Sequence, residues 1–299
     1  MNQDQDPTVA PTVKAPAEPG PLQIERRRPG RSDAVNPHLI PLLRGDGVRS
    51  ACGACREGAA IFPFSVAFQP VVDLQEGRID AYEALVRGPE GEGAAHVLAQ
   101  VTLANRYAFD QACRVKAIEL AARLRIDRQI NINFLPNAVY EPRACIQTTL
   151  RTAARTGLPL HRLTFEIVES EEIVNTPHLL GIIAEYRRYG FRVALDDFGT
   201  AHSGLARLVQ LRPDIVKLDR VLVQDCDTDR ARLAVVAGLL RIGAEIDVKM
   251  VLEGVETAGE VAALAAAGAR YMQGFYFARP AFEHAAAEAE IHWPVPVPA

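Results

Sequence analysis

Short runs rich in β-branched and aromatic residues alternate with longer helical runs from residue 62 onward. Eight of these runs are strand candidates, at residues 64–74, 78–88, 129–133, 163–168, 191–197, 214–219, 248–255 and 270–277. Helix candidates between them include 109–124, 178–190 and 231–244, and Gly190 ends the second as a helix C-cap would. This alternation predicts an α/β fold with a mostly parallel sheet, and eight strands favour a closed barrel. An open, doubly wound sheet is the alternative, although no glycine-rich phosphate loop follows the first candidate strand.

The two ends of the chain lack this pattern. Eight of the twenty prolines fall before residue 42, so we expect a disordered tail at 1–45 and a cysteine-containing lead-in at 46–61. The barrel is expected over 62–290, with a proline-rich tail at 291–299. The basic run Arg26–Arg28 is either a solvated part of the tail or a docking patch for a regulatory protein partner.

The charge and hydropathy of the sequence exclude several partners. A formal net charge of −4 gives no general attraction to DNA or to anionic lipid. The sequence shows neither a secretory signal nor an apolar stretch of transmembrane length. We therefore expect a cytoplasmic protein that binds neither DNA nor a membrane.

Five cysteines are scattered along the chain, which suits a reducing compartment better than a disulfide framework. Cys52 and Cys55 form a Cys-x-x-Cys pair ahead of the first candidate strand. A zinc or iron–sulfur site normally needs four ligands, so this pair would need a second copy of the chain to complete it. A redox switch and an incidental pair are the alternatives, and the sequence leaves all three open.

Polar side chains lie within or just after nearly every candidate strand. They are Glu83, Asn133, Glu166, Glu169, Asp196, Asp197, Lys217, Asp219, Glu253, Glu256 and Gln273. The carboxyl ends of parallel barrel strands converge on one face, so these groups would share a site with a large excess of negative charge. Burying unpaired carboxylates is costly, and one or two divalent cations would neutralise them. Oxygen ligands without His or Cys favour Mg²⁺ or Mn²⁺, and adjacent aspartates suit a pair of ions.

Each of these residues has a simpler interpretation when taken alone. The pair Asp196 and Asp197 could cap a helix, and Lys217 could snorkel or pair with a single acid. Glu83 could face outward from its strand, and Gln273 could be a turn or core amide. Their recurrence at successive strand ends favours a metal site of the kind that hydrolyses phosphate esters.

Seven separated motifs resemble, in order and spacing, those of the EAL-domain family of bacterial cyclic di-GMP phosphodiesterases. They cover residues 62–285 and read YEALVRG, NINFLPNAVY, FEIVESEE, ALDDFGTAHSG, DIVKLD, LEGVET and YMQGFYFARP. The sequence looks closest to EAL domains that stand alone or are joined to blue-light-sensing domains. The resemblance implies a modified TIM (β/α)8 barrel with an antiparallel first strand, a homodimer, and hydrolysis of cyclic di-GMP to pGpG with two Mg²⁺ or Mn²⁺ ions per site.

The resemblance also implies roles for individual residues. The implied metal ligands are Glu83, Asn133, Glu166, Asp196, Asp197 and Glu253. The implied contacts to the dinucleotide or the attacking water are Gln69, Leu85, Arg87 and Gln273. Lys217 would orient this water or help to deprotonate it, and would act in catalysis with Glu83 and the two aspartates. Glu169 would anchor the loop after the aspartates, and Glu256 would lie behind the ligands.

The loop after the aspartates departs from the family pattern. It reads GTAHSG, with Ala201 and His202 where the family more often has glycine and an aromatic residue. Losing a glycine restricts the backbone, so one expectation is reduced activity at an intact site. His202 is either an ordinary loop residue or a proton shuttle. The alternative to an enzyme is a catalytically weak or inactive cyclic di-GMP receptor or protein-interaction module.

Overall fold

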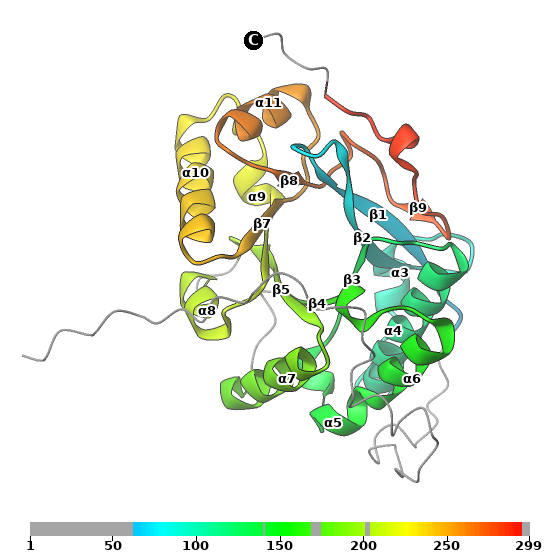
Figure 1. Ribbon diagram of the computed structural model, residues 1–299. Helices are drawn as coiled ribbons and strands as arrows, with labels where there is room; N and C mark the ends of the chain where they lie inside the picture. Colours follow the sequence, from blue (N-terminus) through cyan, green and yellow to red (C-terminus); the bar gives the residue numbers. More distant parts are fainter. Residues whose placement is uncertain (1–61, 140, 169–174, 201–203, 295–299) are drawn as a thin grey trace, which may run out of the picture. The chain divides into compact units, whose positions relative to one another are not determined.

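A computed structural model of the chain describes residues 62–139, 141–168, 175–200 and 204–294. Seven strands of this part run parallel in chain order: β2 (Arg78–Arg87), β3 (Gln129–Asn133), β4 (Leu163–Val168), β5 (Arg192–Phe198), β6 (Ile215–Leu218), β7 (Lys249–Leu252) and β8 (Tyr271–Met272). Strand β1 (Ser65–Asp73) pairs antiparallel with both β2 and β8 and closes the sheet into a barrel (Figure 1). The short β9 (Ala281–Phe282) pairs with β1. The expected modified TIM barrel is confirmed, and an open sheet is excluded.

Helices surround the strands of the barrel (Figure 1). They are α3 (Ala94–Leu98), α4 (Arg106–Arg123), α5 (Pro142–Cys145), α6 (Gln147–Thr156), α7 (Thr176–Arg188), α8 (Gly204–Leu211), α9 (Arg220–Val223), α10 (Arg230–Glu245) and α11 (Ala258–Ala266). The helices predicted at 109–124, 178–190 and 231–244 correspond to α4, α7 and α10. Gly190 follows α7 with a φ of 91°, a left-handed conformation that glycine adopts readily. Within the described residues, no helix combines the length and the apolar character needed to cross a bilayer.

Successive side chains of each strand face opposite sides of the barrel wall. A small apolar cluster of Val71, Ala81, Ala194, Ile215 and Val251 fills the interior. On the parallel strands, each of these residues stands two positions before a polar residue that the sequence places in the site. The polar residues therefore lie on the same inner face, one layer closer to the carboxyl ends of the strands.

Two predicted strands are shorter than expected. The runs 248–255 and 270–277 contain only the short strands β7 and β8. After Met272 the chain turns at Gly274, where a Cβ atom would lie 1.9 Å from the carbonyl oxygen of Val255. Only glycine permits this approach of two backbones, so Gln273 ends the strand pattern and the next residues form a turn.

Several expectations fall on residues outside the described ranges. These include the tail at 1–45, the lead-in at 46–61 with Cys52 and Cys55, and most of the tail at 291–299. They also include Glu169, Ala201 and His202. The expectations for these positions stay predictions.

A buried ion pair joins the end of β1 to the start of β8. The carboxylate of Asp73, which is fully buried, accepts hydrogen bonds from Nε of Arg270 at 2.9 Å and from Nη2 at 2.7 Å. Burial alone would raise the pKa of Asp73. The Arg270 guanidinium and the backbone N–H groups of Glu76 and Gln75 outweigh burial and hold this pKa below its ordinary value.

Replacing this carboxylate should reduce stability in a pH-dependent way. Asp73→Asn should lower the melting temperature by a few degrees near pH 7, because the guanidinium loses its charged partner. A carboxyl group whose pKa is lowered by folding stabilises the fold above its unfolded pKa, and this stabilisation is lost as pH falls through the folded pKa. Urea denaturation should therefore show the difference between variant and wild type shrinking below about pH 4. If the difference in unfolding free energy between variant and wild type were the same at neutral and acidic pH, the lowered pKa of Asp73 would be contradicted.

Candidate metal centre

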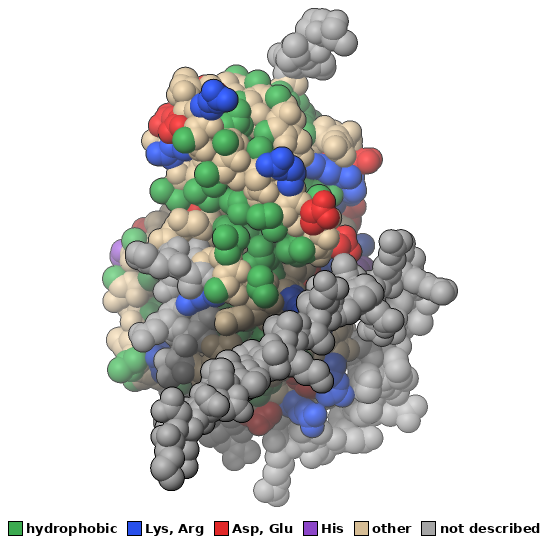
Figure 2. All heavy atoms as spheres, turned by 90° about the vertical axis from the view of Figure 1, so that its left-hand side faces the viewer, with side chains coloured by type: hydrophobic (Ala, Val, Ile, Leu, Met, Phe, Trp, Pro, Cys, Tyr) green, Lys and Arg blue, Asp and Glu red, His purple; other side chains and the backbone are tan. Residues whose placement is uncertain are grey.

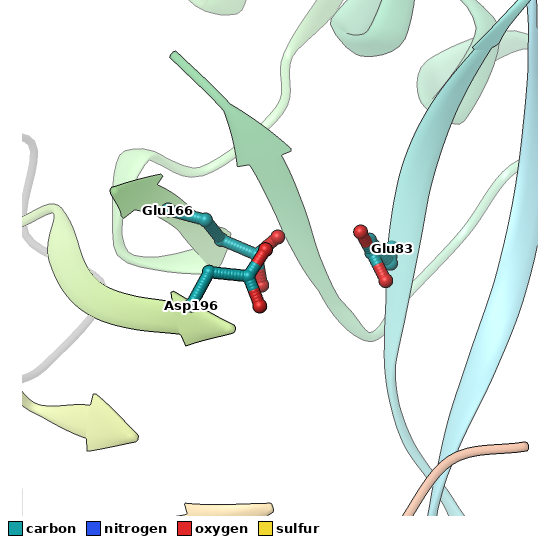
Figure 3. Close-up of side chains that lie close together, drawn as sticks. All are labelled: Glu83, Glu166 and Asp196. Atoms are coloured by element: carbon teal, nitrogen blue, oxygen red, sulfur yellow. The ribbon is translucent and has the colours of Figure 1, made fainter. Parts of the chain in front are cut away.

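Lys217 of β6 lies at the centre of a ring of carboxylates, with only 1% of its side chain exposed. Its Nζ lies 2.8 Å from an oxygen of Glu253, 2.9 Å from Asp196, 3.0 Å from Glu166 and 3.3 Å from Glu83. These acids come from β2, β4, β5 and the residue after β7. Figure 3 shows Glu166 and Asp196 pointing across the barrel interior toward Glu83.

The ring carries more negative charge than one lysine can balance. Burial alone would lower the pKa of Lys217, but Asp196 and the other carboxylates raise it well above its ordinary value. Burial raises the pKa of Glu166 and of Glu253 well above the usual range, and the neighbouring carboxylates raise both further. Beyond the ion pair with Lys217, neither carboxylate oxygen of Glu166 has a hydrogen-bond partner among the described residues. Buried acceptors in this state are suited to a bound cation.

A distortion of β5 brings two adjacent aspartates to one site. In a regular strand, Asp196 and Asp197 would face opposite sides of the sheet. The pairing of β5 with β6 shifts register between Leu195 and Phe198, and Asp197 has a left-handed φ of 53°. Aspartate tolerates this conformation better than most residues. Burial and then the Asp196 charge raise the pKa of Asp197 to about 6.

This geometry decides against helix capping by the two aspartates. Both residues lie within β5, and Oδ1 of Asp196 accepts a hydrogen bond from the backbone N–H of Asp197 at 3.0 Å. The sequence pattern places both acids at the site but gives no indication of the local bulge that turns them to the same side.

Two groups of three carboxylates are close enough to share a cation. One contains Glu83, Glu166 and Asp196, the other contains Asp196, Asp197 and Glu253, and the ligand atoms of each group lie within 4.8 Å of one another. The two groups share Asp196, an arrangement that suits two neighbouring ions. Oxygen donors alone fit hard divalent cations such as Mg²⁺ or Mn²⁺.

Asn133 joins the same cluster. Its Nδ2 donates to Oε1 of Glu83 at 3.2 Å, so the amide lies against the acid ring. All six residues that the sequence places as metal ligands therefore meet at one end of the barrel.

A cavity of about 260 Å³ adjoins the acids. It is lined by Gln69, Glu83, Asp219, Arg220, Glu253, Gly254, Glu256, Gln273, Gly274 and Phe275. Nε2 of Gln273 donates to Oε1 of Gln69 at 3.2 Å and to Oε2 of Glu83 at 2.8 Å. The two glutamines and Glu83 thus form one connected wall between the cavity and the carboxylate ring.

Three of the remaining candidate residues lie around this region. Leu85 and Arg87 continue the face of β2 that carries Glu83. Burial lowers the pKa of Arg87, and the carboxylate of Glu83 opposes that shift. Glu256 forms an ion pair with Arg220 at 2.9 Å, at the cavity and outside the ring around Lys217.

Three further residues line the cavity: the sequence pattern includes Asp219 among the polar residues at the strand ends, but it does not single out Arg220 or Phe275. Asp219 and Arg220 follow β6 directly, and Phe275 lies three residues beyond β8. Asp219 accepts a hydrogen bond from the backbone N–H of Val221 at 2.7 Å and so caps α9. Asp219 and Phe275 lie within the predicted strands 214–219 and 270–277, and Arg220 directly follows the first of these. A search of the strand ends for every polar and aromatic side chain would have included all three.

Divalent cations should stabilise this fold. Addition of Mn²⁺ to the metal-free chain should raise the melting temperature, because the ions neutralise the excess carboxylates, and at a hundredfold excess over Kd the gain is about 2.7 kcal/mol. EDTA should reverse the shift, and Glu166→Gln should reduce it. The matched control is Glu185→Gln, a buried acid on α7 whose partners are arginines, which should keep the shift. An identical shift in the Glu166 and Glu185 variants would exclude Glu166 as a ligand.

Comparison with known proteins identifies similar structures. The crystal structure of a standalone versatile EAL protein from Vibrio cholerae O395, in its c-di-GMP bound form, is 43% identical with a TM-score of 0.73. The match covers 75% of this chain and 95% of that one. The manganese and cyclic di-GMP complex of BlrP1 from Klebsiella pneumoniae is 31% identical with a TM-score of 0.71, over 76% of this chain and 58% of that one.

The curated relatives include one protein that is named an antirepressor and one that is named a cyclic di-GMP phosphodiesterase. The blue light- and temperature-regulated antirepressor BluF from Escherichia coli is 28% identical over 71% of this chain and 53% of BluF. The cyclic di-GMP phosphodiesterase NbdA from Pseudomonas aeruginosa is 27% identical over 71% of this chain and 28% of NbdA. The chain spans 33% and 28% of the length of two further curated relatives, and thus only a part of such proteins.

The family model described as the EAL domain matches residues 60–280, which contain every motif and site residue discussed above. The likeness to a stand-alone EAL protein and to BluF agrees with the expected position of the sequence within that family. The chain belongs to the EAL domain family.

Proposed function

We propose that the chain hydrolyses cyclic di-GMP to linear pGpG with a pair of Mg²⁺ or Mn²⁺ ions. The observation that supports this most is the complete set of acids around Lys217, together with Asn133, beside a cavity. An anionic phosphodiester would be repelled by these carboxylates unless cations lay between them. The names of NbdA and of the two ligand-bound structures agree with this substrate.

The six oxygen-donor residues would hold the ions. When bound, such ions supply an activated water and neutralise charge on the phosphoryl oxygens. In the reaction, the water oxygen would lose a proton and form a bond to phosphorus. The bond from phosphorus to the 3′ oxygen would break, and that oxygen would take up a proton and leave as a hydroxyl group. The product keeps its phosphate at the 5′ end, which gives pGpG.

The other residues of the site would bind the dinucleotide and orient the attacking water. The Lys217 ammonium would donate to the water oxygen and stabilise developing negative charge. Gln273, held by Gln69 and Glu83, would fix the position of the water or the adjacent phosphate oxygen. Arg87 would donate its guanidinium fork to a phosphate or a guanine edge, and Leu85 would contact the dinucleotide.

Product analysis tests this function. The purified chain with cyclic di-GMP and Mg²⁺ or Mn²⁺ should release pGpG, detected by chromatography. Glu83→Ala and Lys217→Ala should each lower kcat more than about a hundredfold, because each removes a charge needed at the reacting phosphate. Circular dichroism should show that the variants remain folded, and Glu185→Gln should keep wild-type turnover. No pGpG with either metal would defeat the proposal.

A cyclic di-GMP receptor without turnover is the second candidate. Ala201 and His202 depart from the family pattern next to the aspartates, and the relative BluF is named as an antirepressor. Binding of cyclic di-GMP without formation of pGpG would favour this function. Absence of binding would exclude both candidates.

An exposed apolar surface supports the expected homodimer. Leu205 and Val209 on α8 are 57% and 71% exposed, and Val221 on α9 and Val235 on α10 are each 49% exposed. Figure 2 faces the flank of the barrel that carries α8 and α10, and hydrophobic side chains gather on it. Large exposed apolar patches mark interaction sites, and twofold symmetric dimers are the commonest assemblies. The proposed occupant is a second copy of the chain.

A charge placed in this patch should separate the dimer. Val209→Asp should elute as a monomer in size-exclusion chromatography with light scattering, because the carboxylate would be buried without a partner at the interface. Leu103→Asp is the matched control, since Leu103 is 78% exposed on the segment between α3 and α4 and should leave the dimer intact. A monomeric wild type, or a dimeric Val209→Asp chain, would contradict the proposed interface.

A further inference from the structure

A fully buried ion pair lies outside the barrel wall, behind the metal centre. Asp110 and Arg114 are one turn apart on α4, are 3% and 0% exposed, and are joined by Oδ2 and Nη2 at 2.5 Å. Nη1 of Arg114 also donates to the hydroxyl of Tyr186 on α7 at 2.8 Å. Neither the proposed chemistry nor the sequence motifs use these residues.

Aromatic rings enclose the guanidinium of Arg114. Its central carbon lies 5.4 Å from the ring centroid of Phe134, 5.3 Å from that of Phe165 and 5.8 Å from that of Tyr186. The three rings also contact one another, with centroids 4.9–5.8 Å apart. The planar guanidinium is therefore held in one position by rings on β4, on α7 and at the residue that follows β3.

These rings are neighbours in sequence of two candidate metal ligands. Phe134 directly follows Asn133, and Phe165 directly precedes Glu166. Because side chains alternate along a strand, an outward ring at one position orients the inward ligand next to it. The backbone N–H of Phe134 also donates to the carbonyl of Glu166 at 3.2 Å, which ties the ends of β3 and β4 together.

Asp110 holds the same segment through its backbone. Its Oδ1 accepts a hydrogen bond from the N–H of Leu135 at 2.9 Å, two residues after Asn133. One carboxylate therefore fixes both the chain that leaves β3 and the arginine that packs on its aromatic ring. Buried ion pairs often contribute little net stability compared with apolar residues of the same volume, so a geometric role explains this one better.

We propose that Asp110, Arg114 and Tyr186 are positioning residues that hold Asn133 and Glu166 in the geometry needed to bind a divalent cation. This inference rests on the proposed metal centre. It predicts that loss of the buried network weakens cation binding beyond what loss of stability alone would cause.

The ion pair of Asp73 and Arg270 provides a matched control. It also contains a fully buried carboxylate held by an arginine, but it joins the end of β1 to the start of β8, at the opposite end of the barrel from the metal centre. Asp73→Asn should therefore lower stability while leaving the metal ligands in place.

Calorimetric titration of the full chain with Mn²⁺ tests the inference. Asp110→Asn should weaken Mn²⁺ affinity about tenfold, the loss usual when a group that supports a metal ligand is removed. Asp73→Asn should change the Mn²⁺ affinity by less than about twofold, although it should lower the melting temperature about as much as Asp110→Asn does. Tyr186→Phe keeps the ring and removes only the hydroxyl group, and it should also weaken affinity. If Asp110→Asn does not fold, this milder variant decides the question.

The outcomes separate this inference from the proposed function. Asp110→Asn and Tyr186→Phe chains that bound Mn²⁺ as tightly as the wild type would overturn the positioning role, even if the wild type produced pGpG. A second outcome is that the wild type binds Mn²⁺ without producing pGpG and that both variants bind Mn²⁺ more weakly. This result would support the positioning role and exclude the enzyme. A wild type that bound neither Mn²⁺ nor Mg²⁺ would overturn both.

Discussion

The ammonium group of Lys217 holds four carboxylates from four parts of the barrel within 3.3 Å of one point. Without a cation at this position, these acids would repel one another in a buried site. One lysine still leaves a large negative excess, and this excess is the property that makes the site suitable for metal ions. The packing of the site and the proposed chemistry thus both depend on the excess of carboxylates over the single Lys217 ammonium.

The barrel wall connects that site to the packing behind it. On β3 and β4, a candidate ligand that faces inward is next in sequence to an aromatic ring that faces outward, so Asn133 and Phe134, or Phe165 and Glu166, cannot move independently. The Arg114 guanidinium fixes the outward rings, and the Lys217 ammonium fixes the inward carboxylates. The positions of the candidate ligands therefore depend on two buried side chains, Arg114 outside the barrel wall and Lys217 inside it.

The distortion at the end of β5 shows where prediction from sequence stops. The pattern of an apolar run followed by two aspartates identifies both residues as candidates for one site. A regular strand would separate them, and only the bulge and the left-handed backbone of Asp197 bring them together. Such a conformation costs about 1–3 kcal/mol and is stable only where the surrounding structure enforces it, which the local sequence does not encode. The same limit applies to Arg220 and Phe275, whose place at the cavity depends on turns after short strands.

The sequence by itself determined the order of the strands, the chemical types of the ligands and the excess of acids over lysine. These follow from local periodicity and from the high free energy of burying unpaired charges, and both can be read along the chain. Tertiary structure alone decided that Glu256 pairs with Arg220 and that a buried arginine lies behind Asn133 and Glu166. These contacts join residues far apart in sequence, and distances between such residues are set by how the strands and helices pack.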